Sequence, residues 1–313
     1  MSATKLISIL GAGHSGSTLL DLVLGNHSKI QSVGEISHWD QYLQQKKECA
    51  CGVPPQSCEF WKPIVEQWYQ YLASMQSDET TITDTRSRTV VGASPRFRYR
   101  TCLGLTIFFP MYKWPHVTNT LLPEFQQRAT NINKLYDLVR KVSGKPVVCD
   151  SSKSNYRFRL LHARQPTNAK AIYLTRDGRA VAASHFRRNN EAVRDGAKRW
   201  RFANIYTQKL LRTLPRESYI HIRYEELCRE PEMTLSRICN FLGYPFEEEM
   251  MQFTGKTLHN IGGNRMRMSG LFDIQEDLKW RETLSSKQLL EFDRVAGKTN
   301  NKLLGRYKLQ QII

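Results

Sequence analysis

A glycine-rich loop between a predicted strand and a predicted helix constrains the fold of this 313-residue chain more than any other feature. Residues 5–10 form a short β-branched and aliphatic run, which is typical of a buried strand. The loop GAGHSGST follows at 11–18, and the aliphatic stretch at 19–24 has helical periodicity. Glycines in such a turn let successive backbone N–H groups converge on a phosphate at a helix N-terminus. The loop therefore predicts a phosphate site formed by Gly13, His14, Ser15, Gly16, Ser17 and Thr18.

The rest of the sequence continues this alternation of strands and helices. Strands are predicted at 146–149, 171–175 and 218–224, and helices at 156–164, 180–186, 231–242 and 285–296. This order predicts an α/β fold with a central parallel sheet and flanking helices. We expect a single domain over residues 1–313, with an inserted helical or lid region at about 60–145 that binds the substrate.

Part of the expected insertion, Thr80 to Pro123, is basic and aromatic. Its arginines are Arg86, Arg88, Arg96, Arg98 and Arg100, and the aromatic run TIFFPMYKW follows them. These arginines could bind an acidic acceptor or an RNA strand, although a solvated surface is the simpler interpretation. Since no recognised nucleic-acid-binding module accompanies them, we expect no stable nucleic-acid partner.

A second anion site is predicted where the strand at 171–175 ends, in YLTRDGRAVAASH. Arg176 leaves this strand, and Ser184 lies eight residues further on, about two helical turns away. Both side chains could reach one phosphate. Two phosphate sites at neighbouring strand ends of one sheet predict a nucleotide that carries phosphates at two separate positions.

The glycine loop lacks one feature of nucleoside triphosphatases. Ser17 occupies the position of their lysine, so the ammonium group that would hold the β- and γ-phosphates is absent. Asp150, at the end of a predicted strand, is the one candidate for a magnesium carboxylate. A P-loop nucleotide kinase is therefore a weaker alternative, and a non-catalytic nucleotide- or RNA-binding protein is another.

The two motifs GAGHSGSTLL and YLTRDGRAVAASH resemble the 5′-phosphosulfate loop and the 3′-phosphate motif of the sulfotransferase superfamily. The segment RYEELCREPEMTLSRICNFLGYPFE at 223–247 resembles the strand, loop and helix that follow in that family. The resemblance covers residues 6–246, apart from about 60–145. It implies a soluble-type enzyme that uses 3′-phosphoadenosine 5′-phosphosulfate (PAPS) and transfers a sulfuryl group in line, without a metal ion. The implied acceptor is a hydroxyl, or less readily an amine, of a carbohydrate, lipid, tyrosyl peptide or small metabolite.

The resemblance also implies roles for particular residues. Glu35 in SVGEISHW matches a Gly-Glu of tyrosylprotein-type members and is implied as the general base. Lys153 in CDSSKSNY matches a lysine that stabilises negative charge at the active centre. His14 stands where many members have arginine or lysine, so it could act as a cation, a hydrogen-bond donor or a base. Glu35 could instead cap a helix or form a salt bridge, in which case His14 or His38 would be the base.

The late loop GGNRMR at 262–267 resembles the glycine and arginine loop that closes over the 3′-phosphate and adenine in this superfamily. Arg265 and Arg267 are therefore expected to contact the nucleotide. An ordinary basic turn explains the same pattern nearly as well.

The overall charge and hydropathy indicate the class of partner and the compartment. Lysine and arginine number 46 against 29 aspartates and glutamates, which gives a formal net charge of +17 and favours anionic partners. No apolar run approaches the roughly 18 to 20 residues of a membrane span. A secretory signal is also hard to fit to the N-terminus, so we expect a cytoplasmic protein.

Three of the seven cysteines, Cys49, Cys51 and Cys58, cluster in ECACGVPPQSCEFW. A zinc site would need a fourth ligand, and neither a CxxC pair nor a histidine at zinc-finger spacing supplies one. We therefore expect a surface loop with a local thiol pair and no metal.

Overall fold

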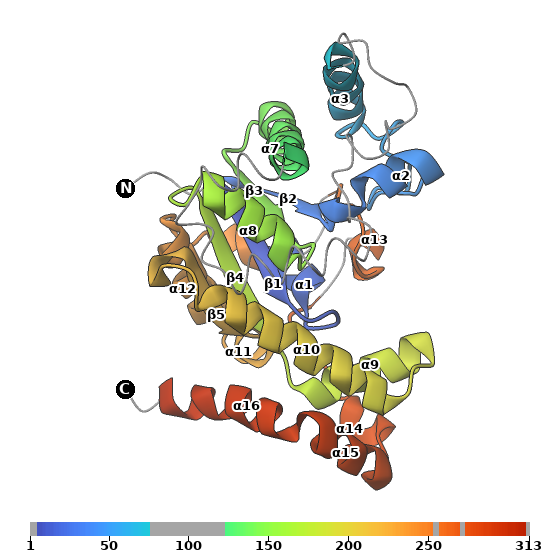
Figure 1. Cartoon of the computed structure of the whole chain (residues 1–313), viewed down its shortest axis with the longest axis vertical. Helices are drawn as coiled ribbons and strands as arrows, with labels where there is room; N and C mark the ends of the chain where they lie inside the picture. Colours follow the sequence, from blue (N-terminus) through green and yellow to red (C-terminus); the bar gives the residue numbers. More distant parts are fainter. Residues whose placement is uncertain (1–4, 76–122, 253–256, 270–272, 311–313) are drawn as a thin grey trace.

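A five-stranded parallel sheet in the order β2-β3-β1-β4-β5 lies at the centre of the computed structural model (Figure 1). The structure describes residues 5–75, 123–252, 257–269 and 273–310. The strands are β1 (Leu6–Gly11), β2 (Ile30–Gly34), β3 (Val147–Asp150), β4 (Ala169–Thr175) and β5 (Tyr219–Arg223). The predicted α/β class and parallel sheet are confirmed. The sequence analysis did not anticipate β2, whose five residues IQSVG include two polar side chains.

The helices alternate with these strands. They are α1 (Ser17–Gly25), α2 (Trp39–Gln45), α3 (Lys62–Ser74), α7 (Pro123–Ser143), α8 (Asn155–Arg164), α9 (Gly178–Asn189), α10 (Val193–Leu211), α11 (Tyr224–Arg229), α12 (Pro231–Leu242), α13 (Met266–Ser269), α14 (Trp280–Thr283), α15 (Ser286–Phe292) and α16 (Lys298–Gln310). Shorter turns are η1 (Ile36–His38), η4 (Arg216–Ser218), η5 (Glu248–Met251) and η6 (Asp293–Gly297). The helix predicted at 231–242 is confirmed as α12, which Gly243 ends in the left-handed conformation that glycine adopts readily.

The two faces of the sheet are covered by different helices because side chains alternate along a buried strand. In β4, Ala171 and Tyr173 join a cluster with apolar residues of α7, α8 and α10. The intervening Ile172 and Leu174 join a cluster with α1, α11 and α12 on the other face. Both faces of the sheet are buried under helices, which explains the nearly continuous apolar sequence of β1 and β4.

A third apolar cluster joins the C-terminal helices to the rest of the protein. Trp200 of α10 and Phe292 of α15 are both fully buried in it, with Ala12 at the end of the first strand. Helices α14, α15 and α16, orange to red in Figure 1, lie along α9 and α10. The predicted helix at 285–296 appears here as α15 followed by the π-helical turn η6.

The expected insertion lies between β2 and β3. Its described parts include α3 and α7, which pack together, and the Tyr71 hydroxyl donates a hydrogen bond to Asn131 Oδ1 at 2.9 Å. The arginine and aromatic segment predicted as a lid falls almost wholly within 76–122, outside the described residues. No helix in the described part of the chain combines the length and apolar character that crossing a bilayer requires.

This topology collects polar residues at one edge of the sheet. All five strands are parallel, so the glycine loop after β1 and the segments after β2, β3 and β4 emerge at the same edge. The chain runs from β1 through α1 to β2 at one end of the sheet, whereas β4 and β5 lie on the other side of β1. Such a switch point leaves a crevice at the carboxyl ends of the strands, where ligands of open α/β sheets bind.

Candidate active site

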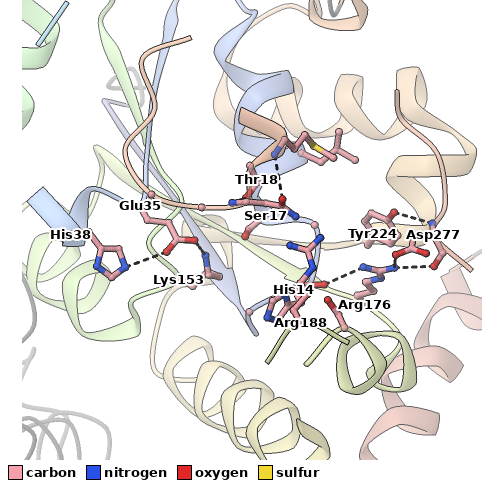
Figure 2. Close-up of a pocket in the computed structure, with 18 of the residues that line it drawn as sticks. His14, Ser17, Thr18, Glu35, His38, Lys153, Arg176, Arg188, Tyr224 and Asp277 are labelled. Carbon is pink, nitrogen blue, oxygen red and sulfur yellow. Dashed lines mark hydrogen bonds and ion pairs between the residues drawn. The ribbon is translucent and has the colours of Figure 1, made fainter. Parts of the chain in front are cut away.

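A pocket of about 650 Å³ opens at the carboxyl ends of the strands (Figure 2). Nine of the predicted site residues line it: Gly13, His14, Gly16, Ser17, Thr18, Glu35, Lys153, Arg176 and Ser184. These residues come from the glycine loop, α1, α9 and the segments that follow β2, β3 and β4. The sequence motifs therefore converge on one cavity, although the chain separates them by up to about 170 positions.

The glycine loop has the backbone form that an anion site needs. Gly16 precedes α1 with φ of 87°, and a Cβ atom there would lie 2.4 Å from the Tyr224 ring, so only glycine fits without displacement. No side chain caps the first turn of α1, whose N–H groups have no acceptors within the helix. The Ser15 hydroxyl is buried and has no hydrogen-bond partner among the described residues. These donors form a cradle that an oxyanion can satisfy.

His14 lies at the centre of the positive charge around this loop. Burial, which has the largest effect, and the charges of His185, Arg188, Lys153 and Arg176 together lower its pKa from 6.5 to about 4. Its ring contacts the His185 ring edge to face, with 4.5 Å between the centroids. His14 is therefore neutral at pH 7 in the free protein. An anion bound beside His14 would oppose the effect of these positive charges and raise its pKa.

Arg176 is held rigidly beside the loop. Its guanidinium stacks on the Tyr224 ring at 4.3 Å from the centroid and donates to the carbonyl oxygens of His14 and Asp277 at 3.2 and 2.9 Å. The Asp277 carboxylate lies 3.4 Å from the same guanidinium, and the Arg176 side chain is only 9% exposed. Because its orientation is fixed before any ligand arrives, little side-chain entropy opposes a bidentate contact to phosphate.

Helix α9 contributes two further residues to this part of the pocket. Ser184 is buried and lines the pocket, as predicted, and Arg188 lines it as well. The sequence analysis missed Arg188. Residues four apart share one face of a helix, so the spacing from Ser184 was a signal that could have found it.

A carboxylate, a lysine and a histidine meet on the opposite side of the loop (Figure 2). Lys153 Nζ lies 2.5 Å from Glu35 Oε1, and His38 Nε2 lies 3.4 Å from Glu35 Oε2. Burial alone would raise the pKa of Glu35, but the hydrogen bond from His38 and the charge of Lys153 lower it to about 2. Glu35 is therefore ionised at neutral pH and can accept a proton. Lys153 has a φ of 57°, an unfavourable conformation for a non-glycine residue that is common at functional sites.

The late glycine loop reaches the pocket through different residues from those predicted. Gly262, Gly263 and Asn264 line the cavity, whereas Arg265 and Arg267 do not. Arg265 is exposed. Arg267 is buried, and its guanidinium donates to the Tyr42 hydroxyl at 3.1 Å and to the Glu48 carbonyl at 3.3 Å. Its position supports a role in holding this loop on α2.

Asp150 does not have the surroundings of a magnesium ligand. It is 2% exposed and accepts hydrogen bonds from the Tyr136 hydroxyl at 2.5 Å and from Arg157 Nε at 3.2 Å. Its other oxygen accepts from the backbone N–H of Ser152 at 2.8 Å. The carboxylate that a nucleotide kinase would need is thus part of a buried network between α7, β3 and α8.

Comparison with known proteins agrees with this geometry. A model described as "Sulfotransferase family" matches residues 108–248. The sulfotransferase domain from the curacin biosynthetic pathway has a similar structure, with 22% identity, a TM-score of 0.52, and coverage of 95% of this chain and 97% of that one. The sulfotransferase domain of the Synechococcus PCC 7002 olefin synthase has 20% identity, a TM-score of 0.51 and coverage of 96% of both chains. No curated protein gives a significant match. The family model thus matches the part of the chain from 108 to 248, and the two solved structures show that the chain has the fold of sulfotransferase domains.

Proposed function

We propose that this protein is a PAPS-dependent sulfotransferase that transfers a sulfuryl group to a hydroxyl of its acceptor. One observation carries the proposal: the glycine loop and the Arg176, Ser184 and Arg188 side chains line a single pocket, where they offer hydrogen-bond donors for two separate anions. A donor with phosphates at both its 3′ and 5′ positions needs two anion sites, whereas a nucleoside triphosphate needs one extended site with a lysine. We also propose that residues 1–313 act as one sulfotransferase domain.

The residues present fit PAPS at both ends. The first turn of α1 and the buried Ser15 hydroxyl would hold the 5′-phosphosulfate, and Arg176, Ser184 and Arg188 would hold the 3′-phosphate. When bound, PAPS supplies an activated sulfuryl group. The basic side chains of Lys153, Arg176 and Arg188 line the pocket and attract an anion before any specific contact forms.

Glu35 is our proposed general base. Its carboxylate lines the pocket and is ionised, and it would take up the proton that the acceptor hydroxyl loses. In the free protein Lys153 holds the pKa of Glu35 low, which makes the carboxylate a weak base. Movement of the Lys153 ammonium toward an anionic group in the pocket would remove part of that effect and strengthen the base. The same movement would place a positive charge where negative charge develops.

The acceptor would enter on the α2 side of Glu35. Gln41, Tyr42 and Lys47 line this part of the pocket. The acceptor classes implied by the sequence, a carbohydrate, lipid, tyrosyl peptide or small metabolite, all offer a hydroxyl to Glu35, whereas an amine would in addition have to be deprotonated from its cationic form.

Nucleotide binding tests the proposal directly. We expect calorimetry to show that the product nucleotide PAP (3′-phosphoadenosine 5′-phosphate) binds at least about tenfold more tightly than ATP with magnesium, because ATP has no 3′-phosphate and the loop has no lysine for its γ-phosphate. Incubation with radiolabelled PAPS and a cell extract should then transfer the label to an acceptor that can be identified. Tighter binding of ATP would favour the kinase alternative, and binding of RNA without PAP would favour the non-catalytic one.

The pH dependence of PAP binding tests the part played by His14. A bound polyanion should raise the pKa of His14 from about 4, so binding takes up a proton and becomes tighter as the pH falls from about 8 to about 6. His14→Gln cannot take up this proton, and its affinity should change less over the same series. The phosphates of PAP titrate equally in both experiments. Equal pH slopes for the two proteins would show that His14 stays neutral in the complex.

A further inference from the structure

A second cluster of reactive side chains lies outside the active-site pocket. Cys49, Cys51 and Cys58 belong to the segment between α2 and α3, and His259 approaches them from the segment before α13. The three Sγ atoms and one imidazole nitrogen all lie within 4.8 Å of one another. The expectation of no metal rested on the lack of a fourth ligand, and the structure supplies that ligand from 201 residues beyond Cys58.

The distances suit a tetrahedral metal site. Cys58 Sγ lies 3.6 Å from Cys49 Sγ, 3.5 Å from Cys51 Sγ and 3.2 Å from His259 Nδ1. Zinc–sulfur bonds of about 2.3 Å in a tetrahedron place the sulfur atoms about 3.8 Å apart. Cys49 Sγ and Cys51 Sγ are closer than this, at 2.7 Å, so binding would separate these two atoms by about 1 Å.

The surrounding contacts orient these ligands. The backbone N–H of Cys51 donates to Cys49 Sγ at 3.4 Å, a contact that stabilises a thiolate. The His259 ring stacks on the Phe60 ring with centroids 5.3 Å apart. The backbone carbonyl of His259 accepts a hydrogen bond from Trp61 Nε1 at 2.5 Å. Cys49 and Cys58 are fully buried. These contacts orient the ligands, and the surrounding structure buries Cys49 and Cys58 and partly buries Cys51 and His259.

We propose that Cys49, Cys51, Cys58 and His259 bind one zinc ion in a structural site. Three thiolates and one imidazole are a donor set that selects zinc, and four protein ligands leave no open position for a substrate or an activated water. Binding releases the thiol protons and leaves a complex with a net charge of −1, which the basic chain tolerates.

The zinc ion would connect the segment between α2 and α3 to the segment before α13, and it would limit the motion of the residues that line the pocket next to His259. His259 lies three residues before Gly262, which lines the pocket. Between them, Asn260 Nδ2 donates to Asp21 of α1 at 2.9 Å, and Ile261 pairs with Gly34 at the end of β2. The Ile261 carbonyl accepts the backbone N–H of Glu35. The metal would therefore fix the strip of chain against which Glu35 is positioned, whatever nucleotide the pocket binds.

The metal content of the full-length protein tests the proposal. Protein purified under reducing conditions, with zinc in the growth medium, should contain about one zinc per chain by mass spectrometry of the metals. Replacing zinc with cobalt should give the intense visible absorption of a tetrahedral thiolate site. Removing the metal with a chelator should lower Tm and increase hydrogen exchange at 257–264, because metal binding is coupled to folding.

Variants identify the ligands. Cys58→Ser and His259→Ala should each lose most of the zinc, whereas His259→Cys should retain it, since four cysteines also form a zinc site. Cys239→Ala is the matched control, because Cys239 is a buried cysteine of α12 outside the cluster, and this variant should keep about one zinc per chain.

Three outcomes would overturn the proposal. One is that the wild-type protein contains no zinc after incubation with zinc under reducing conditions. Another is a Cys49–Cys51 disulfide as the stable form in place of a metal complex. The third is Cys58→Ser protein that is folded and retains a full equivalent of zinc, which would place the metal elsewhere.

Discussion

Arg176→Ala is expected to weaken PAP binding by roughly 10- to 100-fold, because a buried guanidinium that faces the second anion site is lost. AMP, which lacks the 3′-phosphate, should lose far less affinity, because its single phosphate belongs in the glycine loop. Calorimetry gives the change in binding free energy that the substitution causes for PAP and for AMP. The difference between these two changes is the interaction energy between the guanidinium and the 3′-phosphate.

Arg187→Ala is the matched control for this experiment. Arg187 lies on α9, the helix that follows Arg176, and contacts the same Asp277 carboxylate at 3.5 Å, but it does not line the pocket. Its loss should change PAP affinity by no more than about threefold, as is usual for a partly exposed charge. An equal loss in both variants would assign the effect to the Asp277 segment, and unchanged PAP affinity in Arg176→Ala would remove the second phosphate site from the proposed function.

Glu35→Gln should lower turnover by roughly 10²- to 10⁴-fold while leaving PAP affinity within about threefold of wild type. Glutamine keeps an oxygen for the Lys153 ammonium but cannot accept the acceptor's proton. The pKa of Glu35 is about 2 in the free protein, so its protonation should not lower kcat/KM until the pH is far below neutral. Release of PAP from PAPS, measured with the acceptor found by labelling, provides the rate.

Two further variants serve as a control and as a test of the alternative base. Glu66→Gln changes an exposed glutamate of α3 and should retain full turnover. His38→Gln removes the imidazole that contacts Glu35 Oε2 and should have a smaller effect than Glu35→Gln. If Glu35→Gln stays active while His38→Gln does not, the base is His38.

The parts of the site that the sequence predicted are those encoded in short local patterns. The glycine loop and Arg176 each lie directly after a predicted strand, so their neighbours along the chain indicate their position. Glu35 follows β2, a strand that was not predicted, and was identified through the resemblance of its Gly-Glu pair to sulfotransferases. Parallel strands then bring these residues to one edge of the sheet, and nine of the twelve predicted cofactor-binding and catalytic residues line the pocket; Ser15, Arg265 and Arg267 do not.

The parts that were missed depend on contacts between distant segments. His259 meets Cys58 only because Ile261 pairs with the end of β2, and no periodicity in either segment encodes that contact. The polar side chains of β2 weakened its strand pattern, although the surrounding sheet stabilises it. Arg267 looked like an anion-binding residue in the sequence, but its guanidinium is buried against Tyr42 and Glu48.

The pairing of Ile261 with Gly34 also bears on how the chain folds during its synthesis. A Cβ atom at Gly34 would lie 2.3 Å from the Ile261 carbonyl, so the two backbones are in direct contact across more than 220 intervening residues. During synthesis the N-terminal loop and helix leave the ribosome long before that partner does, and domains larger than about 150 residues commonly pass through partly folded states. A nascent chain shorter than about 260 residues can therefore form its glycine loop, but the backbone N–H of Glu35 still lacks the Ile261 carbonyl to which it donates in the folded protein.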